Sequence, residues 1–158
     1  MRIAYIVWTV LTATVVAQAP DPRLTVSDVE TITGITGVHV VAPGSQPGAG
    51  PGLNFAGPDN QLILMVNFGT DALYRRAREQ KEMAMGSTKV PMVLYHANLP
   101  GIGDEAFDSP PGPVQYVIYL RKGSKAASVT TYFDSSGKKT RLSMDQLKTI
   151  AKTVADRL

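Results

Sequence analysis

The sequence predicts an α+β fold: an antiparallel sheet of five to seven strands with two or three helices, the C-terminal helix packed on one face. Three observations predict it. The C-terminal stretch repeats apolar residues at helical spacing, two neighbouring segments alternate apolar and polar residues around a Lys-Gly turn, and strand-length apolar runs precede them. The chain has 158 residues and no cysteine, so packing and hydrogen bonds must hold a single domain without disulfides.

The C-terminal helix is predicted over Met144 to Arg157. Ser143 and Gln146 have the spacing of a capping box, and Leu142 and Leu147 have that of a hydrophobic staple. Its apolar face comprises Met144, Leu147, Ile150, Ala151, Val154 and Leu158.

Two further helices are expected. The first begins after Thr25, a potential N-cap, and ends at Gly34. The second is predicted from Ala72 to about Ala84, with a loop over Met85 to Lys89 behind it. Along this helix, Arg75 and Glu79 are four residues apart, as are Arg78 and Glu82, which predicts weak surface ion pairs.

Runs of apolar or alternating residues predict the strands. They cover Leu53 to Ala56, Leu62 to Phe68, Pro91 to Tyr95, Val114 to Arg121 and Ala126 to Phe133. The run from Leu62 to Phe68 is almost wholly apolar and should be central. Between Ala42 and Gly52 the chain is rich in proline and glycine, which predicts a mobile loop at 42–52.

The first 19 residues resemble a signal peptide. Arg2 precedes an apolar run from Ile3 to Val16, and Ala17-Gln18-Ala19 forms a small-residue cleavage pattern. An uncleaved N-terminal anchor is the alternative, because the apolar run is only slightly shorter than a membrane span. We therefore expect one domain over residues 20–158, exported to the periplasm or to the extracellular space.

Four motifs of the chain resemble small exported domains of unknown function that occur in bacterial secreted proteins and lipoproteins. They are Leu24-Thr25-Val26-Ser27-Asp28-Val29, Pro100-Gly101-Ile102-Gly103-Asp104-Glu105-Ala106-Phe107, Arg121-Lys122-Gly123 and the helix from Leu147 to Leu158. The second fits the pattern Pro-Gly-x-Gly-Asp-x-Ala-aromatic. Some such domains carry paired cysteines, which this chain lacks. The resemblance implies a fold more than a function.

The Gly-Asp segment is the strongest candidate for a ligand site. Its glycines could present amides to an anion, and its carboxylates could face a cation. The candidate ligand-binding residues are Gly101, Gly103, Asp104, Glu105, Arg121 and Lys122. The alternative is purely structural: the glycines allow positive φ in a tight turn, Asp104 binds amides of that turn, and Ala106 and Phe107 fill the core.

A small hydrolase or metal-dependent enzyme would need His96 together with Asp104, Glu105 or Asp108. The other histidine, His39, is 57 positions away, and no serine lies in a Gly-x-Ser-x-Gly elbow. We therefore assign no catalytic residue, no metal ligand and no cofactor from the sequence.

Basic residues form three clusters that could meet an anionic surface. They are Arg75, Arg76, Arg78 and Lys81; Arg121, Lys122 and Lys125; and Lys138, Lys139 and Arg141. Because export argues against nucleic acid, we expect a non-catalytic module that binds an unidentified protein or an anionic envelope component. Membrane contact is expected only through an uncleaved leader.

Overall fold

The computed structural model describes residues 21–85, 87–109, 115–134, 136–137 and 139–158. The predicted leader lies outside these residues. Within them, no helix is both long enough and apolar enough to cross a membrane. The elements are α1 (Val26–Thr33), β1 (His39–Val41), β2 (Leu53–Ala56), β3 (Leu62–Thr70), α2 (Asp71–Glu79), β4 (Glu82–Met85), β5 (Thr88–Pro91), β6 (Ala97–Asn98), β7 (Glu105–Asp108), β8 (Gln115–Lys122), β9 (Lys125–Tyr132) and α3 (Met144–Asp156).

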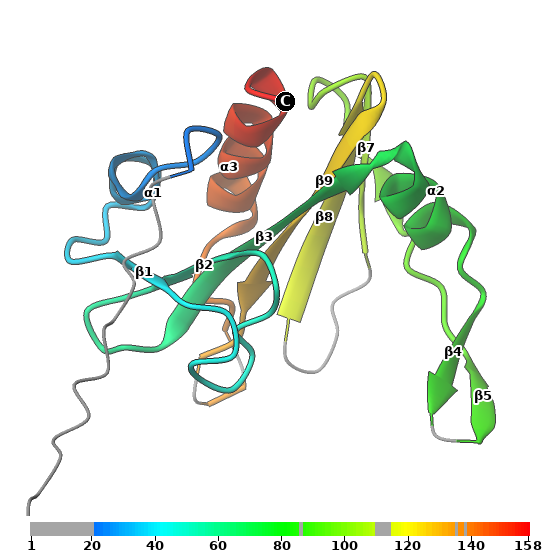
Figure 1. Cartoon of the computed structure of the whole chain (residues 1–158), viewed down its shortest axis with the longest axis horizontal. Coiled ribbons are helices and arrows are strands. Elements are labelled where there is room, and N and C mark those ends of the chain that lie inside the picture. The colour runs from blue at the N-terminus through cyan, green and yellow to red at the C-terminus, as the bar shows by residue number, and fades with distance from the viewer. Residues whose placement is uncertain (1–20, 86, 110–114, 135, 138) are drawn as a thin grey trace, which may run out of the picture.

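Seven of the strands form one antiparallel sheet in the order β1-β2-β3-β9-β8-β7-β6. Its centre is the pairing of β3 with β9, in which Val66 lies opposite Val129. Strands β4 and β5 form a separate hairpin that projects from the body beyond α2 (Figure 1). The α+β class and the antiparallel sheet predicted from the sequence are confirmed.

Helices α1 and α3 lie on one face of the sheet, and α2 lies on the other (Figure 1). We call the first the inner face; its strands contribute Leu64, Val66, Ile118, Leu120, Ala127 and Val129 to the main core. From α3, Leu147, Ile150 and Val154 are fully buried in the same core. The C-terminal helix therefore covers one face of the sheet, where it contacts β8 and β9.

The opposite face, which we call the outer face, carries a smaller core. There Tyr74 and Ala77 of α2 pack with Phe107 and Ala126 of the sheet. The Phe107 ring stacks on that of Tyr119, with 5.1 Å between the ring centroids. Helix α2 begins directly after the central strand β3. This short connection keeps the helix near β3, where it also contacts β8 and β9.

Both predicted N-caps form, and each is a capping box, although the sequence had indicated a capping box only at Ser143. The Thr25 hydroxyl accepts a hydrogen bond from the Asp28 amide, and Ser143 does the same for Gln146. The Asp28 carboxylate also forms two hydrogen bonds with Arg157, of 2.6 and 2.9 Å. The Asp28 carboxylate thus caps α1 and also connects α1 to the end of α3. The Arg157 guanidinium holds the pKa of Asp28 well below its usual range.

The prediction for the segment after Asp71 was partly wrong. Helix α2 ends at Glu79, and the residues expected to continue it form the β4–β5 hairpin instead. Of the expected strand Pro91 to Tyr95, only Pro91 lies in a strand. Within Asp71–Glu79 only Tyr74 and Ala77 are buried, so the apolar face that holds the helix against the sheet is short.

The proline- and glycine-rich segment 42–52 folds back over the outer face. Its Gly44 amide donates to the Ala49 carbonyl at 2.9 Å, and the Tyr132 hydroxyl of β9 donates to the Gly48 carbonyl at 2.9 Å. Asn54 also donates to the Gly50 carbonyl. These hydrogen bonds place the segment against β2 and β9. The mobility of residues 42–52 stays a prediction.

Replacing Ile150 by Ala tests the dependence of the fold on α3. We expect the free energy of unfolding to fall by about 2 to 5 kcal/mol, because the side chain is fully buried between helix and sheet. Lys152→Ala, two residues along the same helix but exposed, should change it by less than about 0.5 kcal/mol. Urea denaturation of both variants provides the measurement, and equal losses would contradict the packing.

Candidate functional site

The turn between β6 and β7 carries the Gly-Asp segment, and its two glycines differ in what they require. Gly101 and Gly103 both have positive φ, of 80° and 59°. A Cβ atom at Gly103 would lie 2.4 Å from the Arg121 carbonyl oxygen, whereas one at Gly101 would have no neighbour within 4 Å. Gly103 is therefore needed both for its dihedral angle and for the close approach of the β7–β8 backbone.

Asp104 joins this turn to the neighbouring hairpin. Its amide donates to the Arg121 carbonyl at 2.9 Å, and its carboxylate accepts from the Gly123 amide at 2.7 Å. The expectation that Asp104 would bind amides of its own turn was wrong, since the turn between β8 and β9 supplies the donor. Ala106 and Phe107 are buried, as the structural alternative predicted.

Arg121 lies across the strands from Glu105. Its guanidinium donates to the Glu105 carboxylate at 2.7 Å and lies 3.6 Å from an oxygen of Asp71. Lys122, by contrast, reaches away toward α3, where its ammonium lies 3.4 Å from the Asp156 carbonyl. Of the six predicted site residues, the structure therefore brings five together at one end of the sheet and separates Lys122 from them.

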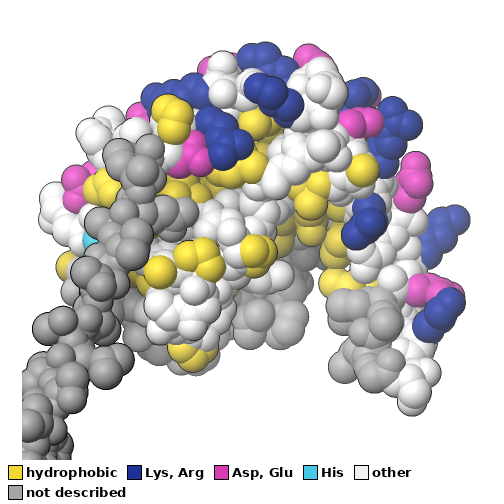
Figure 2. Space-filling view, viewed as in Figure 1, with side chains coloured by type: hydrophobic (Ala, Val, Ile, Leu, Met, Phe, Trp, Pro, Cys, Tyr) yellow, Lys and Arg dark blue, Asp and Glu magenta, His cyan; other side chains and the backbone are white. Residues whose placement is uncertain are grey.

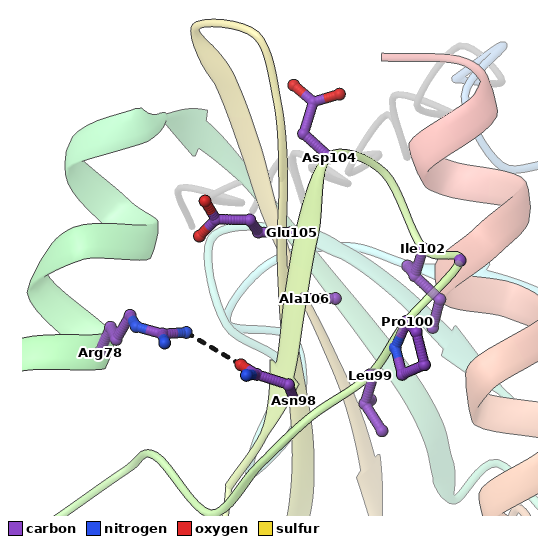
Figure 3. A pocket seen from close by; sticks show the side chains of 9 residues that line it. Arg78, Asn98, Leu99, Pro100, Ile102, Asp104, Glu105 and Ala106 are labelled. Carbon is purple, nitrogen blue, oxygen red and sulfur yellow. Dashed lines mark hydrogen bonds between the residues drawn. The ribbon is translucent and has the colours of Figure 1, made fainter.

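A pocket of about 380 Å³ opens beside this turn (Figure 3). It is lined by Arg78, Asn98, Leu99, Pro100, Gly101, Ile102, Asp104, Glu105 and Ala106. Arg78 and Asn98 were not among the predicted site residues. The spacing of Arg78 and Glu82 had suggested an ion pair along a longer helix, but Glu82 lies in β4 and pairs with Lys89.

Arg78 is held in place at the pocket wall by neutral groups. One guanidinium nitrogen, Nη1, lies 3.2 Å from both the Tyr74 hydroxyl and the Asn98 side-chain oxygen. The guanidinium also lies 4.8 Å from the centroid of the Tyr95 ring. Among the residues that the structure describes, no carboxylate lies within 4.0 Å of Arg78, so its charge is oriented without being neutralised at contact distance.

The pocket also has negative charge, at the start of β7. Asp104 and Glu105 follow one another at the start of β7, and Glu105 points toward α2 in Figure 3. The Arg121 guanidinium is the main cause of the lowered pKa of Glu105, and Tyr74 and Arg78 add smaller contributions. Arg78 and Glu105 both line this pocket.

His96 does not join this pocket and lies instead beside Asp108. Its Nδ1 atom is 3.2 Å from the Asp108 carboxylate, which also accepts from the Ala97 amide at 2.9 Å and from the Tyr116 hydroxyl. Burial raises the pKa of Asp108, but these hydrogen bonds outweigh burial and leave the pKa below its usual value. The cluster fastens β6 to β7 and β8.

Asp104 and Glu105 are engaged elsewhere, so they do not gather around His96. In the described part of the chain, no three His, Cys, Asp or Glu side chains lie close enough to hold a metal ion. His39 lies at the start of β1, at the opposite edge of the sheet from His96. Of the three acids that the enzyme alternative could use with His96, the structure thus places only Asp108 beside it.

Most of the predicted basic clusters are interleaved with acidic side chains (Figure 2). Arg75 pairs with Asp71 instead of Glu79, and Arg141 pairs with Asp59. The Lys125 ammonium lies against the Leu158 carbonyl. Lys138 falls outside the described residues. A continuous cationic surface of the kind that binds anionic polymers does not follow from these clusters.

A larger hollow of about 470 Å³ lies near the other end of α2, where its lining includes Asp21, Arg23, Asn67 and Phe68. The Arg23 guanidinium there is paired with Asp21 and lies 3.5 Å from the centroid of the Phe68 ring. The cation of this hollow is thus already paired with a carboxylate, whereas Arg78 in the pocket beside the Gly-Asp turn has none within 4.0 Å among the described residues. Searches against protein-family models, curated proteins and solved structures give no match to this chain.

Substituting the two turn glycines separates their roles. Gly101→Ala should cost about 1 to 2 kcal/mol, the penalty of positive φ alone. Gly103→Ala should cost distinctly more, because its Cβ would also press on the Arg121 carbonyl and shift the backbone. Thermal unfolding of both variants measures the difference, and equal penalties would show that the close approach does not matter.

The Asp108 cluster should make stability depend on pH. A carboxylate whose pKa is lowered on folding stabilises the protein above its unfolded pKa, and this contribution is lost as pH falls through the folded value. We expect Asp108→Asn to cost about 1 to 3 kcal/mol at pH 6 and to flatten the fall in stability below about pH 4. Unfolding measured from pH 6 to pH 2 checks this, with the exposed Asp156→Asn as control. Parallel curves for Asp108→Asn and the unmodified chain would be inconsistent with this role.

Proposed function

We propose that the chain is a non-catalytic exported module that binds its ligand in the pocket beside the Gly-Asp turn. The observation that carries the proposal is Arg78, whose guanidinium contacts Tyr74, Asn98 and Tyr95 and has no carboxylate of the described residues within 4.0 Å. Although Arg78 is exposed, these contacts restrict its rotamers before any ligand arrives, which lowers the cost of binding.

The size and position of the pocket support the same proposal. A volume of about 380 Å³ lies within the range of small-molecule sites, and the walls combine apolar with charged groups. The turn that forms one wall is braced from behind by the bonds from Asp104 to Arg121 and Gly123. A braced wall keeps its shape when the ligand leaves.

A hydrolytic or metal-dependent function has less support. Asp104 and Glu105 bind Gly123 and Arg121, and the carboxylate nearest to His96 is itself buried and bonded to Tyr116. Among the described residues, no third His, Cys, Asp or Glu joins His96 and Asp108 to complete a metal site.

A fragment screen followed by amide chemical shifts of the ¹⁵N-labelled full chain tests the proposal. Fragments that bind should shift amides of Asn98 to Ala106, and the large side chain of Asn98→Trp should fill the pocket and reduce binding at least tenfold. Ser87→Trp, in the distant β4–β5 turn, is the matched control and should bind normally. If no fragment shifts the turn, or if all binders shift other surfaces, the proposed function is wrong.

A further inference from the structure

The pocket beside the Gly-Asp turn has separated charges of both signs, and this pattern indicates the class of its ligand. Arg78 supplies a cation at one side, and Glu105 and Asp104 supply carboxylates along the start of β7. Arg121, which is bonded to Glu105 and lies 3.6 Å from Asp71, adjoins these residues without lining the pocket. The pocket wall therefore carries charges of both signs.

The cationic side suits a carboxylate. Arg78 uses Nη1 for Tyr74 and Asn98, while its Nη2 and Nε atoms have no hydrogen-bond partner in the described part of the chain. These remaining donors can bind the two oxygens of one carboxylate in parallel. A phosphate dianion fits less well, because Asp104 and Glu105 would repel its second charge.

The acidic side suits an ammonium group. Asp104 uses only Oδ2 for the Gly123 amide, so its Oδ1 atom has no partner among the described residues. Glu105 accepts a hydrogen bond from Arg121, and both Arg121 and Arg78 lower its pKa, Arg121 most strongly. A ligand ammonium placed here would meet carboxylates that fixed hydrogen bonds already orient.

The apolar wall lies between these charges and the loop. Leu99, Pro100 and Ile102 line the side opposite Arg78 and Glu105 in Figure 3. An aliphatic group can pack against this wall while charged groups reach the polar side. The wall thus suits a ligand with an apolar side chain in addition to its two charges.

We propose that this pocket binds a small zwitterion that carries a carboxylate, an ammonium group and an aliphatic side chain, the chemistry of an amino acid or a short peptide. In this arrangement Arg78 binds the carboxylate, and Glu105 and Asp104 bind the ammonium group. The inference rests on the proposed function and adds the identity of the ligand class to it.

Four probes of similar shape test the assignment, titrated into the ¹⁵N-labelled full chain and followed at the amides of residues 98–106. They are leucine, leucyl-leucine, 4-methylpentanoate, which lacks the ammonium group, and isopentylamine, which lacks the carboxylate. We expect either leucine or the dipeptide to bind at least tenfold more tightly than both singly charged probes, since one charge-assisted contact is lost in each. Whichever of the two binds more tightly identifies the source of the zwitterion.

Variants assign the two ends. Arg78→Gln should weaken the preferred zwitterion at least tenfold and leave the affinity for isopentylamine unchanged, and Arg78→Lys should lie between. Glu105→Gln should weaken the zwitterion and isopentylamine and spare 4-methylpentanoate. Arg76→Gln is the matched control: it removes the same charge from α2, but Arg76 does not line the pocket, so binding should stay within twofold. Amide shifts outside the pocket confirm that each variant is folded.

The outcomes separate this inference from the proposed function. If 4-methylpentanoate binds as tightly as leucine and Glu105→Gln has no effect, the ligand is a simple carboxylate and the zwitterion is wrong, while binding in the pocket stands. The inference is also wrong if only uncharged fragments shift the turn. If no probe and no fragment shifts residues 98–106, both proposals are wrong.

Discussion

The pairing of β3 with β9 is the contact on which the rest of the structure depends. It joins two strands more than fifty residues apart in the sequence and holds them in register from Leu64 opposite Thr131 to Thr70 opposite Lys125. The chain leaves β3 into α2 on the outer face and leaves β9 toward α3 on the inner face. One strand pair therefore fixes where both helices can lie, and a slip of one residue would exchange the two faces.

Unequal cover of the two faces creates the candidate site. The inner face carries α1 and α3 and the main core, whereas helical cover of the outer face is limited to α2 and a small aromatic core. At the end of α2 the helix passes beside the β6–β7 edge of the sheet. This brings Arg78 to Asn98, although neither belongs to the Gly-Asp segment that forms the opposite wall. The pocket is thus a consequence of where a short helix ends.

The sequence was informative where local chemistry decides the structure. The N-cap at Thr25, the capping box at Ser143, the Lys-Gly hairpin and the apolar face of α3 all depend on neighbours within a few residues, and all were predicted. The course of the chain from Gln80 to Asn98 was not, because its helix-forming residues have no sheet surface to cover, and strand pairing takes their place. The hydrogen bond from Arg78 to Asn98 spans twenty residues and left no sequence pattern to detect.

The Gly-Asp segment shows why a motif can mark a site without forming its chemistry. Gly103 is required by the Arg121 carbonyl, and Asp104 by the Gly123 amide, so both residues are explained by the join between the β6–β7 turn and the β8–β9 hairpin. Pocket-lining side chains such as Arg78 and Asn98 are exposed, and the hydrogen bond between them places no such constraint on the backbone. They can be exchanged at little cost to the fold, whereas the turn cannot. It follows that ligand preference can change in a protein of this design while the turn stays the same, and that the turn alone does not identify what is bound.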